Sequence, residues 1–204
     1  MSGPAMKRRD LLKLGARKAA EVALEVAGQK ASLRAEAWIR PPFAVDEPKF
    51  LARCTRCDKC LEACGYDVLF KLTSDQGLAA AGTPAMNLLH RGCRLCPDWP
   101  CVSACEPAAL ALPAGVKNKA PVVPPKLAVA SIDERSCLPY LGPECGACAD
   151  SCPVPGALQW PDGRKPVIDQ DLCAGCALCR EACIVDPKAV GIAVFIADKE
   201  GSGA

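Results

Sequence analysis

Cysteines dominate the residues of this chain that could do chemistry. Sixteen of them occur among 204 residues, in four groups of four. In every group, three residues separate the third cysteine from the fourth. Thiolates at such short spacings are the usual ligands of iron–sulfur clusters. The sequence therefore predicts a protein built to hold iron and sulfur.

The four groups share one motif with two local expansions. The first and fourth groups have the spacing C-x2-C-x2-C-x3-C, the second opens its middle gap to four residues, and the third opens its first gap to seven. The groups are Cys54, Cys57, Cys60 and Cys64; Cys93, Cys96, Cys101 and Cys105; Cys137, Cys145, Cys148 and Cys152; and Cys173, Cys176, Cys179 and Cys183.

The motifs are expected to work in pairs. A tight cysteine loop covers three corners of a cubane cluster, and in bacterial two-cluster ferredoxins the cysteine after the x3 step ligates the other cluster. A helix that begins near the third cysteine aims the fourth across the module. With neighbouring motifs paired, the predicted ligand sets of four [4Fe-4S] clusters are Cys54, Cys57, Cys60 and Cys105; Cys93, Cys96, Cys101 and Cys64; Cys137, Cys145, Cys148 and Cys183; and Cys173, Cys176, Cys179 and Cys152.

The predicted fold is a small α+β architecture with two tandem bacterial-type 2[4Fe-4S] ferredoxin lobes. We place an N-terminal helical extension at 1–37, the lobes at 48–112 and 128–197, and a proline-containing connection at 113–127. Proximity in sequence and this connection favour pairing of adjacent motifs. A nested pairing, first motif with fourth and second with third, is the alternative.

Each repeat is expected to contain a short strand, a cysteine loop, a short helix and a second short strand. An Ile-Asp pair precedes the third and fourth motifs, and an apolar stretch follows every fourth cysteine. These stretches are 68–70, 109–112, 157–160 and 190–195. Internal repetition of this kind indicates one structural unit used several times.

Other cysteine chemistries fit less well. Triplets of thiols two residues apart are too local for a disulfide framework. Structural zinc favours two separated C-x2-C pairs or a Cys/His mixture, and His90 is the single histidine. No C-x-x-C-H sequence is present for a c-type haem, and a Rieske centre needs two histidines.

Composition and charge exclude several classes of function. Aromatic residues make up 4% of the chain, so a conventional core should be thin and bound clusters should supply folding energy. The net charge of +2 comes from intermixed acids and bases, which indicates neither nucleic acid nor an anionic membrane surface as partner. No apolar run approaches the roughly 20 residues of a spanning helix.

The N-terminus bears on localisation. Lys7 to Lys13, with Arg8 and Arg9, has the look of a twin-arginine export signal. Charged residues interrupt every apolar stretch that should follow, whereas 11–27 has amphipathic helical spacing. We predict a vestigial signal that has become a docking helix, hence a cytoplasmic protein, in part membrane-associated. A plain surface helix, or twin-arginine export to the periplasm, is the alternative.

Segments beyond the cysteine spacing carry a resemblance to one family. The stretches 39–44 and 50–64, and the wide gap from Cys137 to Cys145, resemble the F-type ferredoxin subunit of the periplasmic nitrate reductase (Nap) system. The segments 82–84 and 93–101 look more like the G-type subunit and a methylamine-utilisation ferredoxin. The resemblance covers residues 38 to 195.

This resemblance implies an iron–sulfur accessory protein without catalysis of its own. Its partner would be a redox protein, either the catalytic subunit of a reductase or a quinol-oxidising membrane protein. The expected function is electron relay for a nitrate reductase type system. A cytoplasmic maturation factor that binds the immature reductase is the alternative, and a structural subunit is a third reading.

Five further residues could be given functional roles, but a simpler structural role is favoured for each of them. Trp99 and Tyr140 lie in the two expanded cysteine loops and are expected to shield clusters from water. His90 is expected to be solvated. Asp133 and Asp169, which occupy equivalent places before two cysteine loops, are expected to form turns and not a catalytic pair.

Overall fold

The computed structural model describes residues 18, 38–115 and 122–195. The predicted N-terminal helix and twin-arginine segment lie outside the described residues, apart from Lys18, as do six residues of the predicted connection. Within the described residues, no helix combines the length and the apolar character needed to cross a bilayer.

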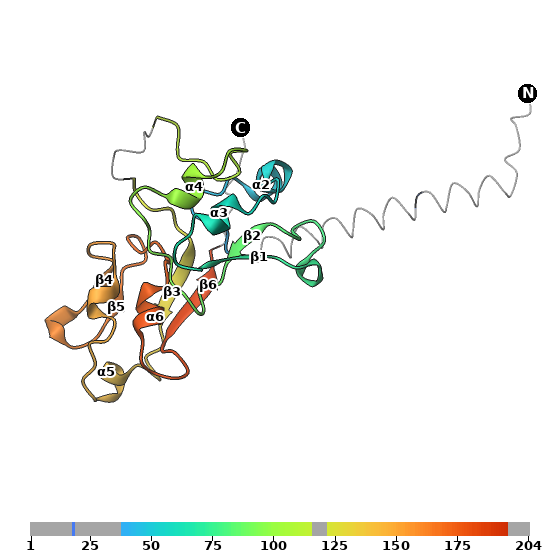
Figure 1. The fold of residues 1–204 in the computed structure, drawn as a ribbon. Helices are drawn as coiled ribbons and strands as arrows, with labels where there is room; N and C mark the ends of the chain where they lie inside the picture. The colour runs from blue at the N-terminus through green and yellow to red at the C-terminus, as the bar shows by residue number, and fades with distance from the viewer. Residues whose placement is uncertain (1–17, 19–37, 116–121, 196–204) are drawn as a thin grey trace, which may run out of the picture.

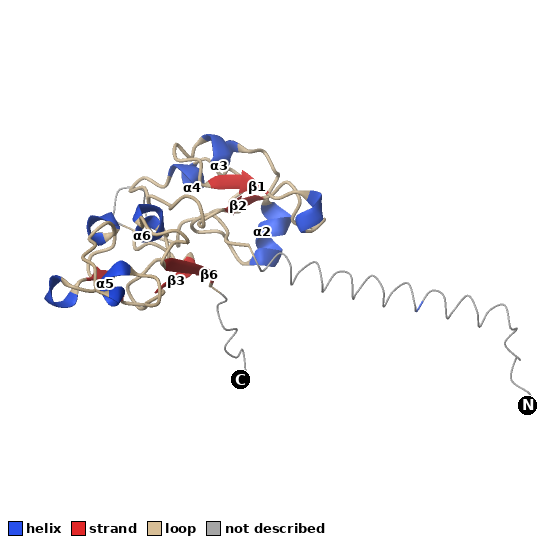
Figure 2. Cartoon of the chain, turned by 90° about the horizontal axis from the view of Figure 1, so that it is seen from below, coloured by secondary structure: helices blue, strands red, loops and turns tan. Residues whose placement is uncertain are grey.

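Short helices and short antiparallel strands make up the fold, with loops between them (Figures 1 and 2). The helices are α2 (Glu47–Arg53), α3 (Lys59–Glu62), α4 (Pro100–Ser103), α5 (Leu138–Leu141) and α6 (Leu178–Ala182), with 3-10 helices η1 (Ser74–Gln76), η2 (Ala149–Ser151) and η3 (Pro161–Gly163). The strands are β1 (Leu69–Lys71), β2 (Pro84–Met86), β3 (Ala128–Ile132), β4 (Leu158–Gln159), β5 (Val167–Ile168) and β6 (Val190–Val194). This mixture is the small α+β architecture that the sequence predicted.

Strand pairing repeats one pattern in the two halves of the chain. In the second half, β3 pairs with β6 and β4 pairs with β5, both antiparallel. In the first half, β1 pairs with β2, while an isolated antiparallel bridge between Ala44 and Leu110 takes the place of the longer pair. Figure 1 shows the two halves next to each other, the first in blue to green and the second in yellow to red.

Most of the apolar stretches predicted after each fourth cysteine form strands. β1, β4 and β6 lie where the sequence predicted them. The stretch 109–112 does not form a strand; it contributes only the bridge at Leu110, with backbone hydrogen bonds from Val45 to Ala109 and from Ala111 to Phe43. The helix α5 was not predicted, because the wide gap between Cys137 and Cys145 carries no helical periodicity.

A short helix begins at or beside the third cysteine of each motif. Cys60, Cys101 and Cys179 lie in α3, α4 and α6, and Cys148 directly precedes η2. The residues that precede the three α-helices have a left-handed backbone: Asp58 with φ 65°, Trp99 with φ 44° and Ala177 with φ 66°. A left-handed non-glycine residue costs roughly 1–2 kcal/mol. Such strain persists where the surrounding structure holds it, and it concentrates at functional sites.

Among the residues that the structure describes, the apolar core is divided into four small clusters of buried side chains. Cysteines are members of three of them: Cys93 and Cys176 in one, Cys60 in another, and Cys148 with Cys179 in a third. The cysteine sites and the core therefore occupy the same volume, as the low aromatic content predicted.

One buried polar network holds the start of the first half in place. Arg40 donates to both carboxylate oxygens of Glu47, to Thr83 Oγ1 at 2.9 Å and to the Pro84 carbonyl at 2.8 Å. Its guanidinium also lies 4.6 Å from the ring centroid of Phe50, which is fully buried. The side chains of Arg40 and Glu47 are only 10% and 15% exposed. This network joins residues 40–50 to β2.

Replacing Arg40 with alanine should lower the free energy of unfolding by about 3 kcal/mol, because it leaves the carboxylate of Glu47 partly buried and unpaired. Anaerobic urea denaturation followed by circular dichroism measures the change. The control is Arg135→Ala, since Arg135 pairs with Asp133 while 93% exposed. That variant should change stability by less than about 1 kcal/mol. Equal losses in the two variants would contradict the proposed role of the network.

Candidate metal centres

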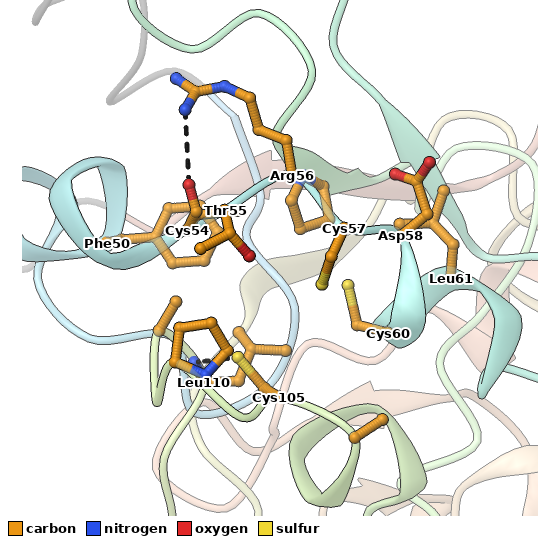
Figure 3. A pocket seen from close by; sticks show the side chains of 14 residues that line it. Phe50, Cys54, Thr55, Arg56, Cys57, Asp58, Cys60, Leu61, Cys105 and Leu110 are labelled. Carbon is orange, nitrogen blue, oxygen red and sulfur yellow. Dashed lines mark hydrogen bonds between the residues drawn. The ribbon is translucent and has the colours of Figure 1, made fainter.

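Cysteines from two neighbouring motifs surround the first cavity. Its lining includes Cys54, Cys57, Cys60 and Cys105. Figure 3 shows Cys57, Cys60 and Cys105 directed into this cavity. Cys54 and Cys57 lie in the segment between α2 and α3, Cys60 lies in α3 itself, and Cys105 follows the end of α4. The backbone N–H of Leu110 donates to Cys105 Sγ at 3.3 Å.

The reciprocal set lines a second cavity. This cavity is lined by Cys93, Cys96, Cys101 and Cys64, with Trp99 and Met86 among the apolar side chains around them. Trp99 is 4% exposed and packs edge-to-face on Phe43, with ring centroids 4.8 Å apart. Its position beside the thiols agrees with the predicted shielding role.

The second half repeats this arrangement. A third cavity is lined by Cys173, Cys176, Cys179 and Cys152, together with apolar residues of β3, β4 and β5. Of the remaining thiols, Cys137, Cys145, Cys148 and Cys183, Cys148 lies in a buried apolar cluster and Cys183 packs against it. Burial, and then the charges of neighbouring thiolates in this group, raise the pKa of Cys137 and Cys148. In the three cavities, each lining combines three thiols of one motif with one thiol of its neighbour, the arrangement expected for adjacent pairing.

None of the sixteen cysteines forms a disulfide, and burial raises the pKa of the most enclosed thiols. Burial raises the pKa of Cys60, Cys93, Cys148 and Cys176 to about 11, and of Cys101 and Cys179 to about 12. Neighbouring thiolates add to the shift in each case. Buried like charges of this kind need a cationic group to remain ionised. The donor set therefore suits a cationic, sulfur-liganded cofactor.

Cys57 is the exception among the thiols. It is the exposed one of the sixteen, and its pKa is lowered by a hydrogen bond from the backbone N–H of Lys59 and another from the side chain of Thr55. The residues on either side of it, Arg56 and Asp58, both have a left-handed backbone. This conformation turns the loop so that its amide groups approach the sulfur.

The two aspartates form turns, as predicted. Asp133 accepts hydrogen bonds from the backbone N–H of Arg135 and from the Ser136 hydroxyl, and these lower the pKa of its carboxyl. Asp169 accepts from the N–H groups of residues 171 and 172. The backbone carbonyls of the two aspartates also accept from the N–H of Cys137 and Cys173. Each aspartate therefore fixes the entry of one cysteine loop.

Two further expectations about single residues can be compared with the structure. His90 is exposed, in agreement with the prediction of a solvated side chain. Tyr140 donates from its hydroxyl to the Pro166 carbonyl at 3.0 Å, and the Lys165 ammonium lies 4.8 Å from its ring centroid. These contacts join the expanded loop of the third motif to the segment before β5.

Sequence reasoning missed Trp160. Its indole nitrogen is buried and has no hydrogen-bond partner among the residues that the structure describes. Trp160 packs against the buried cluster of Cys148, Cys179 and Val190, and it lines an open groove together with Cys145. A buried N–H without an acceptor is costly, and a sulfur atom of a bound cluster would supply one. The site thus fits an iron–sulfur group in this respect as well.

Known proteins with similar sequences carry the description ferredoxin-type in their names. The chain is 36% identical over 166 residues to the ferredoxin-type protein NapG of Haemophilus influenzae, an alignment that covers 76% of this chain and 58% of NapG. It is 33% identical over 198 residues to the methylamine utilization ferredoxin-type protein MauM of Methylorubrum extorquens, covering 91% of this chain and 88% of MauM. The chain belongs to the ferredoxin-type protein family.

The ferredoxin-type protein NapF of Escherichia coli is a further relative, 33% identical over 150 residues, which are 72% of this chain and 80% of NapF. No family model and no solved structure matches the chain. Membership of the ferredoxin-type family confirms the resemblance found in the sequence, and it identifies the chain as an iron–sulfur protein of electron transfer.

Proposed function

We propose that this ferredoxin-type protein binds four [4Fe-4S] clusters and relays electrons to or from a partner redox enzyme, as an accessory protein of a nitrate reductase type system. The observation that carries the proposal is the grouping of the cysteines: each set combines three thiols of one motif with one thiol of its neighbour. That arrangement is the cross-ligation of bacterial two-cluster ferredoxins. The two halves, 48–112 and 128–197, would each be one such lobe.

The partner is proposed from the relatives. NapG and NapF carry the name of one system and MauM that of methylamine utilization, so a protein redox partner is common to both. When bound, the clusters would supply reversible one-electron chemistry. The protein residues would hold the thiolates, exclude water from their cavities and set the hydrogen bonds around them. This role includes no bond-making step.

The proposal is tested by anaerobic assay of iron and acid-labile sulfide, followed by EPR spectroscopy during a dithionite titration. Four cubanes should give about sixteen of each per chain, and all should be reduced and reoxidised reversibly. Zinc in place of iron, or far less iron than that, would contradict the relay. Transfer of a cluster to an apo-protein during the titration would favour the maturation role instead.

The ligand sets make a separate prediction about pairs of variants. Cys105→Ala and Cys57→Ala should lose the same component of the EPR spectrum, because both thiols line the first cavity. Cys64→Ala should match Cys96→Ala for the second cavity. Nested pairing of the motifs predicts a different result, in which Cys183→Ala, and not Cys105→Ala, reproduces the loss seen in Cys57→Ala.

The unpaired indole N–H predicts an effect on one reduction potential. A hydrogen bond to cluster sulfur stabilises the more negative reduced state, and such bonds help to set the potential. Trp160→Phe should therefore lower the potential of one cluster by roughly 40 mV, which corresponds to about 1 kcal/mol for one electron. Iron content should not change. The control is Tyr140→Phe, which removes a hydrogen bond to a backbone carbonyl and should leave all reduction potentials unchanged. If Trp160→Phe also leaves every potential unchanged, the indole has no sulfur acceptor and the prediction is wrong.

A further inference from the structure

The second and fourth cysteine motifs touch each other directly. The backbone N–H of Cys93 donates to the backbone carbonyl of Cys176 at 2.8 Å. Cys93 belongs to the set around the second cavity and Cys176 to the set around the third. Both cysteines are buried, at 8% and 7% exposure. Two cysteine sets from different halves of the chain are thus joined by one hydrogen bond.

Gly92 permits this approach. A Cβ atom at position 92 would lie 2.7 Å from Leu178 Cδ2, 2.8 Å from its backbone N and 2.9 Å from its Cα. Two of these atoms are backbone, so a different rotamer of Leu178 cannot relieve the clash. Any side chain at position 92 would push the loop of Cys93 away from α6.

Side chains of α6 strengthen the same contact. Glu181 accepts from the backbone N–H of Gly92 at 2.7 Å and pairs with Arg94 at 2.9 Å. Arg180 donates to the Leu89 carbonyl at 3.0 Å. Because α6 also carries Cys179, these bonds fix the third cavity against the loop that bounds the second.

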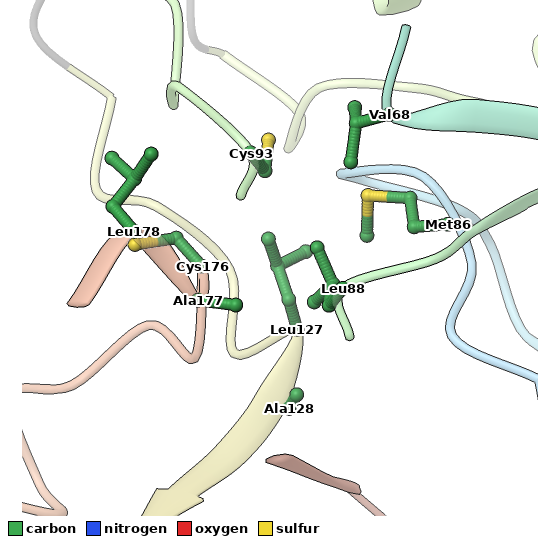
Figure 4. Close-up of a cluster of buried hydrophobic side chains, with 9 residues drawn as sticks. All are labelled: Val68, Met86, Leu88, Cys93, Leu127, Ala128, Cys176, Ala177 and Leu178. Atoms are coloured by element: carbon green, nitrogen blue, oxygen red, sulfur yellow. The ribbon is translucent and has the colours of Figure 1, made fainter. Parts of the chain in front are cut away.

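A shared apolar cluster excludes water around the hydrogen bond. Val68, Met86, Leu88 and Cys93 of the first half pack with Leu127, Ala128, Cys176, Ala177 and Leu178 of the second. Figure 4 shows these side chains converging from both halves, with Cys93 and Cys176 among them. The contact between the two cysteine sets is therefore buried within the apolar cluster that both halves of the chain share.

The other cysteine sets have different neighbours. Cys148 and Cys179 lie in one buried cluster, which joins the set of the third motif to that of the fourth. Cys60 lies in another, against which Cys101 and Cys105 pack, and this joins the first set to the second. The order of contact in space is first, second, fourth and third, in contrast to the order in the sequence.

We propose that electrons cross between the halves at the Cys93–Cys176 contact, so that the relay is linear and runs through the motifs in the order first, second, fourth, third. This inference rests on the proposed function. Gly92 is its positioning residue. The ends of the relay are the first set, where Cys57 is exposed, and the third set, where Cys145 lines the open groove.

The crossing step transfers one electron and forms no bond. The cluster held by the Cys93 set is oxidised by one electron and the cluster held by the Cys176 set is reduced by one, or the reverse. The reductant and the oxidant are the two redox proteins between which the chain acts; dithionite replaces the reductant in the experiment below.

Two full-length variants separate the inner clusters from the outer ones. The inner-pair variant carries Cys57→Ala, Cys60→Ala, Cys145→Ala and Cys148→Ala, which leaves the second and fourth sets. The outer-pair variant carries Cys93→Ala, Cys96→Ala, Cys173→Ala and Cys176→Ala, which leaves the first and third. After dithionite reduction, the EPR spectrum of the inner pair should be split by coupling between the two clusters, and that of the outer pair should not. The opposite pattern would overturn the proposed order.

A single substitution tests the contact with all sixteen cysteines in place. Gly92→Ala should weaken the coupling between the halves and slow reduction of the far clusters, with iron content unchanged. The control is Gly65→Ala, because a Cβ there would have no atom of the described chain within 4 Å. If Gly92→Ala has the iron content and the cluster coupling of the wild type, the inference is wrong, and the proposed function is unaffected. A wild-type protein that contains little or no iron would instead contradict the proposed function itself.

Discussion

Four thiolates must be confined in each of several small apolar cavities, and this requirement governs the rest of the structure. Isolated thiolates resist such burial, which is why the pKa of Cys101 and of Cys179 rises to about 12. A bound cationic cluster would remove the penalty by sharing its charge with the sulfur ligands. The thiols and the hydrophobic core are interdependent, because among the described residues the side chains that exclude water from the thiols also form the buried apolar clusters.

Backbone geometry positions the cysteine loops, a role that a larger hydrophobic core has in other proteins. Left-handed residues at 58, 99 and 177 start the helices that carry the third cysteine of three motifs, and their conformational cost is borne where the thiols must turn inward. Turns at Asp133 and Asp169 fix the backbone where the third and fourth cysteine loops begin.

Locality explains which features could be predicted from the sequence. The aspartate turns, the helices at the third cysteines and the strands β1, β4 and β6 follow from spacing within one motif, and the structure contains them. The bridge at Leu110 and the helix α5 were missed, because pairing with Ala44 and the filling of a wide gap depend on residues distant in sequence. Gly92 and Trp160 carried no signal at all: the role of each is defined by neighbours, Leu178 for one and the Cys148 cluster for the other.

The difference between order in sequence and order in space has a physical origin in the contact made by α6. Of the two motifs in the second half, the fourth has the regular spacing and a loop short enough for Ala177 and Leu178 to pack beside Gly92 and Cys93. The third motif, with its seven-residue gap, supplies none of the side chains of this buried cluster, and its Cys145 lines an open groove. Because the third motif supplies none of the residues of that cluster, its expanded loop needs no shape complementary to the first half, and the groove beside Cys145 stays open.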